Sequence, residues 1–160
     1  MIIDKMGRDE CDALLARTGF GRLACTRDDQ PYIVPIYFAH DRQHLYGFAT
    51  LGQKVEWMRQ NPQVCVQADE VSAPDNWESV VVLGRFRELP VTGANDEARS
   101  RAQSMLERRG SWWQAGYAAS QIRTSPGAHA AIFYQIEILE MTGLRGSPGD
   151  RLIERIKMKS

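Results

Sequence analysis

The chain lacks several features that would assign it to a class of protein at once. No apolar run in its 160 residues approaches the roughly 20 residues that a membrane-spanning helix requires, and the first ten residues contain no apolar signal-peptide stretch. Net charge is also lacking, because 20 basic and 20 acidic side chains cancel. General nucleic-acid binders carry excess positive charge, so we expect no nucleic-acid partner, no membrane partner and a cytoplasmic location.

Cysteine and histidine are scarce. The three cysteines, Cys11, Cys25 and Cys65, are odd in number and far apart, and the three histidines form no cluster with them. Because no pair has the spacing of a metal site or a disulfide framework, we expect a reduced protein without a metal ion. The sequence also shows no serine elbow and no cysteine–histidine arrangement of a nucleophilic enzyme, so no catalytic residue is assigned.

The composition is that of one globular domain. Hydrophobic residues make up 43% of the chain and charged residues 25%, which is ordinary for a folded domain with a core of its own. There is no internal repeat, low-complexity stretch or linker. We therefore expect a single domain over residues 1–160.

Short apolar alternations separated by turns dominate the pattern. They predict six strands, over residues 21–26, 31–40, 45–48, 64–69, 79–89 and 131–143. Proline cannot donate to a sheet, so Pro35 should mark an edge or a bulge, and Gly84 should mark a bend. Helices are expected over 10–18, ended by Gly19, and over 96–110. Six strands with few helices predict a mainly β fold, an antiparallel barrel rather than a parallel sheet.

The stretch "YGFATLGQKVEWMRQNP", residues 46–62, predicts a strand that runs through a small-residue turn into a short helix. Thr50 and Gln53 have the spacing of a capping box, and Gly52 leaves the backbone open to a ligand. A helix start favours an anion, and Lys54 adds a full charge at the same end. A phosphate is the natural occupant, although a first-turn lysine can also be merely solvated.

A second basic residue and one misleading motif complete this part of the pattern. Arg22 projects from the first predicted strand and would strengthen the phosphate site if its side chain reached the same place.

The run "GFGRLA", residues 19–24, fits the glycine pattern of dinucleotide-binding proteins. That pattern functions between a strand and a helix, whereas here it follows a helix and opens a strand. We interpret it as a helix cap and a turn.

Four segments occur in the order and spacing seen in pyridoxamine 5′-phosphate oxidase-like flavoproteins. They are "GRLACT", "QPYIVPIYF", "LYGFATLGQKVEWMRQNPQVCV" and "WESVVVLGRFREL". The chain resembles most closely the nitroimidazole-resistance-type branch of that family. The similarity covers about Glu10 to Leu89, and the final strand "FYQIEILEMTG" also fits.

The resemblance implies a six-stranded split β-barrel that forms a homodimer, with FMN in two clefts at the subunit interface. By position, Arg22 and Lys54 would contact the FMN phosphate, next to Gln53. Ser79 matches a position where the oxidases place a glutamine that reaches the cofactor. The residues that would line the flavin ring are Val34, Pro35, Ile36, Phe48, Ala49 and Thr50.

The chain departs from the oxidases proper at two places. They have serine–arginine–lysine where this chain has Gly52, Gln53 and Lys54. They also carry an arginine and a histidine near the C-terminus for the vitamin phosphate, whereas here Arg145 has no histidine after it. The resemblance therefore does not extend to the site for the vitamin phosphate. Some nitroimidazole-resistance relatives have a histidine near the position of Phe48, which this chain lacks.

A flavin cofactor would carry out the electron transfer itself, while the protein positions it. The leading hypothesis is an FMN-dependent oxidoreductase that passes electrons from a reduced nicotinamide to a small organic acceptor. One alternative is a module that binds flavin or haem without turnover, and another is an interaction protein that uses only the barrel. A deazaflavin in place of FMN also stays open, although a dinucleotide would need a second phosphate cradle that the sequence does not show.

The four tryptophans have different expected roles. Trp112 and Trp113 would either cover the flavin ring or pack on the barrel or a dimer interface. Trp57, within the predicted helix of residues 46–62, is expected in the core. Trp77 precedes the strand that carries Ser79 and is the better candidate for the cleft.

Overall fold

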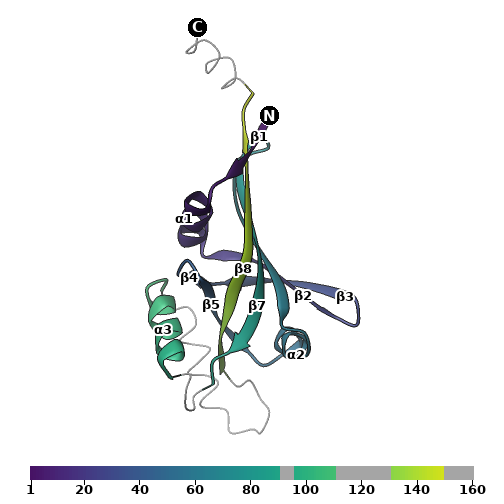
Figure 1. Cartoon of the computed structure of the whole chain (residues 1–160), viewed down its shortest axis with the longest axis vertical. Helices are drawn as coiled ribbons and strands as arrows, with labels where there is room; N and C mark the ends of the chain where they lie inside the picture. Colours follow the sequence, from purple (N-terminus) through teal and green to yellow (C-terminus); the bar gives the residue numbers. More distant parts are fainter. Residues whose placement is uncertain (91–95, 111–130, 150–160) are drawn as a thin grey trace.

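The computed structural model describes residues 1–90, 96–110 and 131–149. Its helices and strands alternate along the chain (Figure 1). In order they are β1 (Ile2–Met6), α1 (Arg8–Thr18), β2 (Phe20–Arg27), β3 (Gln30–Tyr37), β4 (Ala39–His40), β5 (His44–Thr50), α2 (Gln53–Gln60), β6 (Gln63–Ala73), β7 (Asn76–Glu88), α3 (Asp96–Glu107) and β8 (Ala131–Ser147). The expected segment with Trp112 and Trp113 lies outside the described residues.

All strand pairs are antiparallel and belong to one sheet. The strand order is β3-β2-β6-β7-β8-β5-β4, and β1 pairs with β8 beside this path. The mainly β antiparallel fold is thus confirmed, but the described residues form eight strands rather than six. The sequence did not reveal β1, because "IIDKM" does not alternate. It also merged β4 with β3, although the amide of Phe38 leaves the ladder and donates to Gly19.

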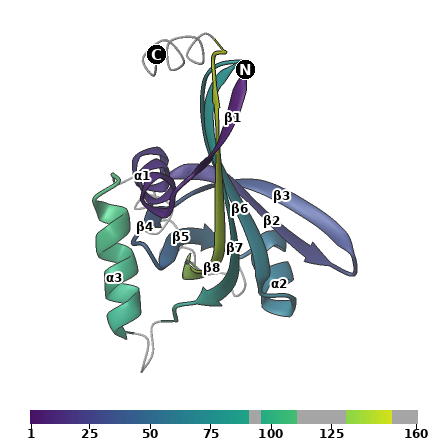
Figure 2. The ribbon, with the colours of Figure 1, turned by 45° about the horizontal axis from the view of Figure 1, so that its top comes forward.

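Hydrophobic residues on the inner face of the curved sheet make the main core. Leu23 and Cys25 of β2, as predicted from their alternation, point into it together with Trp57 of α2. Ile132, Tyr134 and Ile136 of β8 also point inward as predicted, with Ile138 packed at the margin. Phe133, on the opposite face of β8, joins a second cluster beneath α3. In both views α2 and α3 lie on opposite sides of the sheet (Figure 1, Figure 2).

The sheet extends beyond its main body as an arm (Figure 2). The arm consists of β1, the β6–β7 hairpin and the end of β8. Ion pairs hold α1 against the base of this arm. Arg145 of β8 lies 2.6 Å from Glu78 and 2.9 Å from Glu10 of α1. Arg17 of α1 pairs with Glu70 at 2.8 Å and also with Glu78.

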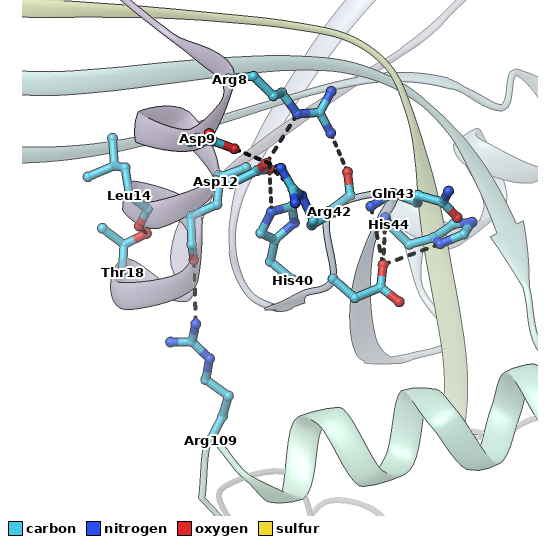
Figure 3. A network of polar contacts seen from close by, with 12 residues as sticks. Arg8, Asp9, Asp12, Leu14, Thr18, His40, Arg42, Gln43, His44 and Arg109 are labelled. Atoms are coloured by element: carbon cyan, nitrogen blue, oxygen red, sulfur yellow. Dashed lines mark hydrogen bonds and ion pairs between the residues drawn. The ribbon is translucent and has the colours of Figure 1, made fainter.

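Polar contacts fix α1 to the turn between β4 and β5 (Figure 3). His40 Nε2 lies 2.8 Å from Asp12 Oδ1, and Arg42 Nε lies 3.5 Å from Asp12 Oδ2. At the other end of α1, Arg109 donates to the carbonyl of Ala16, where a cation complements the helix dipole. His40 is therefore engaged in packing one helix against the sheet.

Three local predictions are confirmed. Gly19 ends α1 in the left-handed conformation, with φ of 57°. Pro35 lies on β3, which is an edge strand of the sheet path. Gly84 marks a shift in the β7–β8 register, where Leu139 is left without an opposite residue between Leu83 and Gly84.

Candidate cofactor-binding site

The start of α2 is open to a ligand, although not in the way that the sequence predicted. Thr50 stays in β5, paired with Ala131, and the helix begins at Gln53 after an N-cap at Gly52. The predicted capping box is therefore wrong, and no side chain in the described part of the chain caps the helix. Gly52 has an extended backbone, and a Cβ placed there would meet no atom of the described residues within 4 Å. The backbone just before the first turn of α2 is thus open to a ligand.

Lys54 is half-buried in the first turn of α2. Within the described residues it has neither an ion-pair nor a hydrogen-bond partner, and the ionisable group that acts on its pKa is the buried thiol of Cys25. Burial lowers the pKa of Lys54, because loss of water penalises its charged form. A desolvated cation without a counter-charge, at the positive end of a helix dipole, is suited to an anion.

The predicted ring-lining residues of β3 do not share one face. Side chains alternate along a strand, so Ile36, which is 5% exposed, packs in the core with Val34 at its margin. Pro35 points to the outer face beside Arg22, its register partner on β2. Of these three, Pro35 alone is exposed on the outer face.

The predicted residues of β5 lie between the core and the start of α2. Ala49 is buried in the main core, and Thr50 is exposed at the end of the strand. Phe48 is half-buried with its ring edge-on to Phe133, at 5.5 Å between centroids. Phe48 therefore supports the α3 side of the molecule.

Arg22 and Ser79 meet in a polar cluster on the outer face, with two residues that the sequence analysis did not select. Arg22 Nη1 donates to Asp69 Oδ1 at 2.8 Å and to Gln67 Oε1 at 3.4 Å. Gln67 Nε2 donates to Asp69 Oδ1 at 3.0 Å and to Ser79 Oγ at 3.1 Å. We call Arg22, Gln67, Asp69 and Ser79 the outer cluster. Alternation in "VCVQAD" could have placed Gln67 and Asp69 on one face, but only the register reveals their partners.

The outer cluster and Lys54 occupy different levels of the sheet. Cys25, whose thiol acts on the pKa of Lys54, points into the core, and Arg22 projects from the opposite face of β2. Asp69 lies two residues past Gln67, the register partner of Arg22. In an antiparallel pair this places Asp69 at the level of Phe20, five residues from Cys25. At about 3.3 Å per residue the separation is roughly 16 Å. No contact joins Arg22 to Lys54 in the part of the chain that the structure describes.

Most exposed large hydrophobic residues share the outer face with this cluster. The strand registers place on one face Ile3, Phe20, Ile33, Tyr37, Val71, Leu83 and Leu144. A groove of about 560 Å³ crosses the same face and is lined in part by Ala24, Cys65 and Leu83. Exposed apolar residues gathered on one face are typical of interaction sites.

Arg145 and Trp77, two further residues noted in the sequence, have other partners. Arg145 is held by Glu78 and Glu10 on the side of the sheet that faces α1. Trp77 packs against Gly146, where a Cβ would lie 2.5 Å from the indole nitrogen. Both therefore stabilise the arm.

Two tests for other kinds of site were negative. The described residues contain no group of three histidine, cysteine or acidic side chains that could hold a metal ion, and the cysteines are free thiols. None of the helices in the described ranges is long and apolar enough to cross a membrane.

Known proteins resemble this chain over nearly its whole length. It is 44% identical to an uncharacterized protein of Rhizobium meliloti (strain 1021) over 150 residues, which cover 94% of this chain and 99% of that protein. A FAD-binding protein from Mesorhizobium loti, known from its crystal structure, is 38% identical with a TM-score of 0.74, covering 92% of this chain and 99% of that one.

The fold extends to more distant structures. A protein from Bacteroides thetaiotaomicron described as a 5-nitroimidazole antibiotic resistance protein has a TM-score of 0.63 at 15% identity, covering 91% of this chain and 89% of that chain. The family model described as pyridoxamine 5′-phosphate oxidase matches residues 7–145. The chain therefore belongs to the pyridoxamine 5′-phosphate oxidase family and has the split-barrel fold of its flavin-binding members.

Proposed function

We propose that this protein binds a flavin nucleotide through its phosphate at the start of α2. The observation that carries the proposal is Lys54, which is half-buried, uncompensated and placed in the first turn of an uncapped helix beside the open Gly52. A charge-assisted contact to phosphate would contribute about 1.5–3 kcal/mol. The FAD-binding relative at 38% identity supports a flavin as the occupant.

The choice between FMN and FAD follows from the number of phosphates to be held. Lys54 and the α2 amides form one anion site, which suits the FMN predicted from the sequence. The name of the Mesorhizobium loti relative favours FAD as the second candidate. Mass analysis of the cofactor released from the purified protein decides between them and also detects a deazaflavin or haem.

The outer face is also the surface that we propose for a homodimer. Seven exposed hydrophobic residues share this face with Arg22, Pro35 and Ser79. A second copy would cover the apolar residues and enclose a flavin ring at the same time. The interface and the part of the cofactor site that holds the ring would then be one surface.

We further propose that the bound flavin makes the protein an oxidoreductase, which passes electrons from a reduced nicotinamide to a small organic acceptor. A flavin supplies the electron transfer, so the chain has only to bind it, orient it and exclude water. Steady oxidation of NADH or NADPH by the loaded protein with an added acceptor is the expected result. Binding without turnover would instead support the flavin- or haem-storage alternative.

The phosphate site is tested by Lys54→Met, which removes the charge and keeps most of the apolar stem. We expect the Kd for FMN to rise about 10- to 150-fold, the equivalent of 1.5–3 kcal/mol. Riboflavin, which has no phosphate, should bind the variant as it binds the wild type. Lys54→Arg should retain most of the affinity, and Lys5→Met serves as a control at an exposed lysine. Equal FMN affinity in wild type and Lys54→Met would refute the site.

A further inference from the structure

We propose that the outer cluster recognises the pyrimidine edge of the flavin ring, and that Arg22 does not hold the phosphate. The proposal rests on the proposed flavin binding and assigns Arg22, Asp69 and Ser79 as ligand contacts, with Gln67 as a positioning residue. The supporting observation is that donors and acceptors of the outer cluster have no partner within the cluster itself.

The internal contacts of the cluster leave three groups available. Arg22 uses only Nη1, so the N–H groups on Nε and Nη2 have no acceptor among the described residues. Within the described ranges Asp69 accepts two bonds, both on Oδ1, so Oδ2 is able to accept another. Ser79 accepts from Gln67 and can still donate its hydroxyl hydrogen. Gln67 donates both of its amide hydrogens within the cluster, to Asp69 and Ser79, and its amide oxygen accepts from Arg22. It therefore links β6 to β2 and β7.

These groups follow one another across three neighbouring strands. Arg22 lies on β2, Asp69 on β6 and Ser79 on β7, and β6 runs between the other two. The outer cluster therefore presents a donor, an acceptor and a donor in that order. The pyrimidine edge of a flavin presents the complement, with the C2 carbonyl as acceptor, the N3 hydrogen as donor and the C4 carbonyl as acceptor.

The charges of the cluster favour a neutral edge over a phosphate. Asp69 lies 2.8 Å from Arg22 and compensates its charge. A phosphate brought to Arg22 would also approach this carboxylate, and like charges disfavour such an arrangement. A ring edge with an N–H group can instead donate to the same carboxylate.

The position of the cluster agrees with this assignment. The backbone of Asp69 lies roughly 16 Å along the sheet from the level of Cys25. Cys25, whose thiol acts on the pKa of Lys54, points into the core, whereas the outer cluster lies on the opposite face of the sheet. A phosphate bound at Lys54 would therefore not contact Arg22, which donates to Asp69. The two sites are separate anchors, one for the phosphate and one for the ring. Pro35, the exposed neighbour of Arg22, lies on the same face.

The experiment measures the affinity of the full chain for riboflavin, FMN, FAD and N3-methylriboflavin by fluorescence titration. In Asp69→Ala we expect the affinities for riboflavin, FMN and FAD to fall by the same factor, about tenfold to a hundredfold. Wild type should discriminate against N3-methylriboflavin, and Asp69→Ala should lose that discrimination. Ser79→Ala should show a smaller common loss. Arg59→Ala, which breaks a comparable exposed pair with Glu88, is the control.

Several outcomes would overturn the assignment. If Arg22 held a phosphate, Asp69→Ala would free its charge, so tighter FMN binding with unchanged riboflavin binding refutes the proposal. A loss in Arg22→Ala that is confined to FMN and FAD, or to FAD alone, also refutes it. Should wild type bind none of the four ligands, the proposed flavin function itself fails. That result differs from a flavin binder in which these variants behave as wild type, which overturns only the ring-edge assignment.

Discussion

Substitution of Leu83 offers a direct test of the outer face as a dimer interface. Leu83 lies on β7, opposite Cys65 on β6, and its side chain is 46% exposed in the single chain. A twofold interface would use the same patch on both subunits. Each dimer would therefore bury this leucine twice.

The expected effect follows from that exposure. Full burial of a leucine is worth about 1.5–3 kcal/mol relative to full exposure, so the exposed part of Leu83 corresponds to about 0.7–1.4 kcal/mol. Two copies give about 1.4–2.8 kcal/mol, which is roughly a 10- to 100-fold change in the dimer Kd. Leu83→Ala should weaken the dimer by nearly this factor. Leu83→Asp should abolish it, because an unpaired buried carboxylate costs several kcal/mol more.

Sedimentation equilibrium over a range of protein concentrations measures the change. Ser104→Asp, an exposed position on α3, provides the matched control for added charge. The melting temperature of the monomer should change little in Leu83→Asp, because the side chain is outside the core of the single chain. A wild-type protein that is monomeric at all concentrations, or a Leu83→Asp protein that dimerises as wild type, would refute the reasoning.

Three further predictions concern stability. Burial lowers the pKa of Lys54 from its usual value of 10.5. The charged lysine therefore destabilises the folded protein fully below the folded-state pKa, and this destabilisation disappears as pH rises through the unfolded-state pKa. Lys54→Met should raise the melting temperature of the flavin-free protein near neutral pH, with a gain that shrinks toward pH 10.5, and an unchanged gain at high pH would contradict this. The buried hydroxyl of Tyr134 has no partner among the described residues, which costs about 1–3 kcal/mol against a few tenths for the void that Tyr134→Phe leaves. That variant should melt about 2–8 °C higher by calorimetry, and a lower melting temperature would show that the hydroxyl is satisfied. A Cβ at Gly47 would lie 2.2 Å from the Tyr134 ring, so Gly47→Ala should lose about 1–3 kcal/mol in urea denaturation, and neutral behaviour would indicate that the ring can move.

Local pattern was sufficient for much of the fold. Alternation identified the buried faces of β2 and β8, because side chains on a strand repeat every two residues whatever the strand pairs with. Gly19 was readable as a helix end, since glycine tolerates the left-handed backbone that ends α1. The same local chemistry placed Lys54 in the first turn of α2, where the structure leaves it uncompensated.

Contacts between distant segments decided the rest. The predicted capping box failed because pairing with β8 keeps Thr50 in β5, where it cannot cap α2. Residues 46–62 alone do not show that Thr50 pairs with β8. The partner of Arg22 is Asp69, 47 residues away, and only the β2–β6 register brings them together. The sequence by itself determined the buried faces of β2 and β8, the end of α1, and the place of Lys54 in the first turn of a helix. Tertiary structure alone decided which charges compensate each other and which apolar residues gather on one face, because both depend on strand order and register.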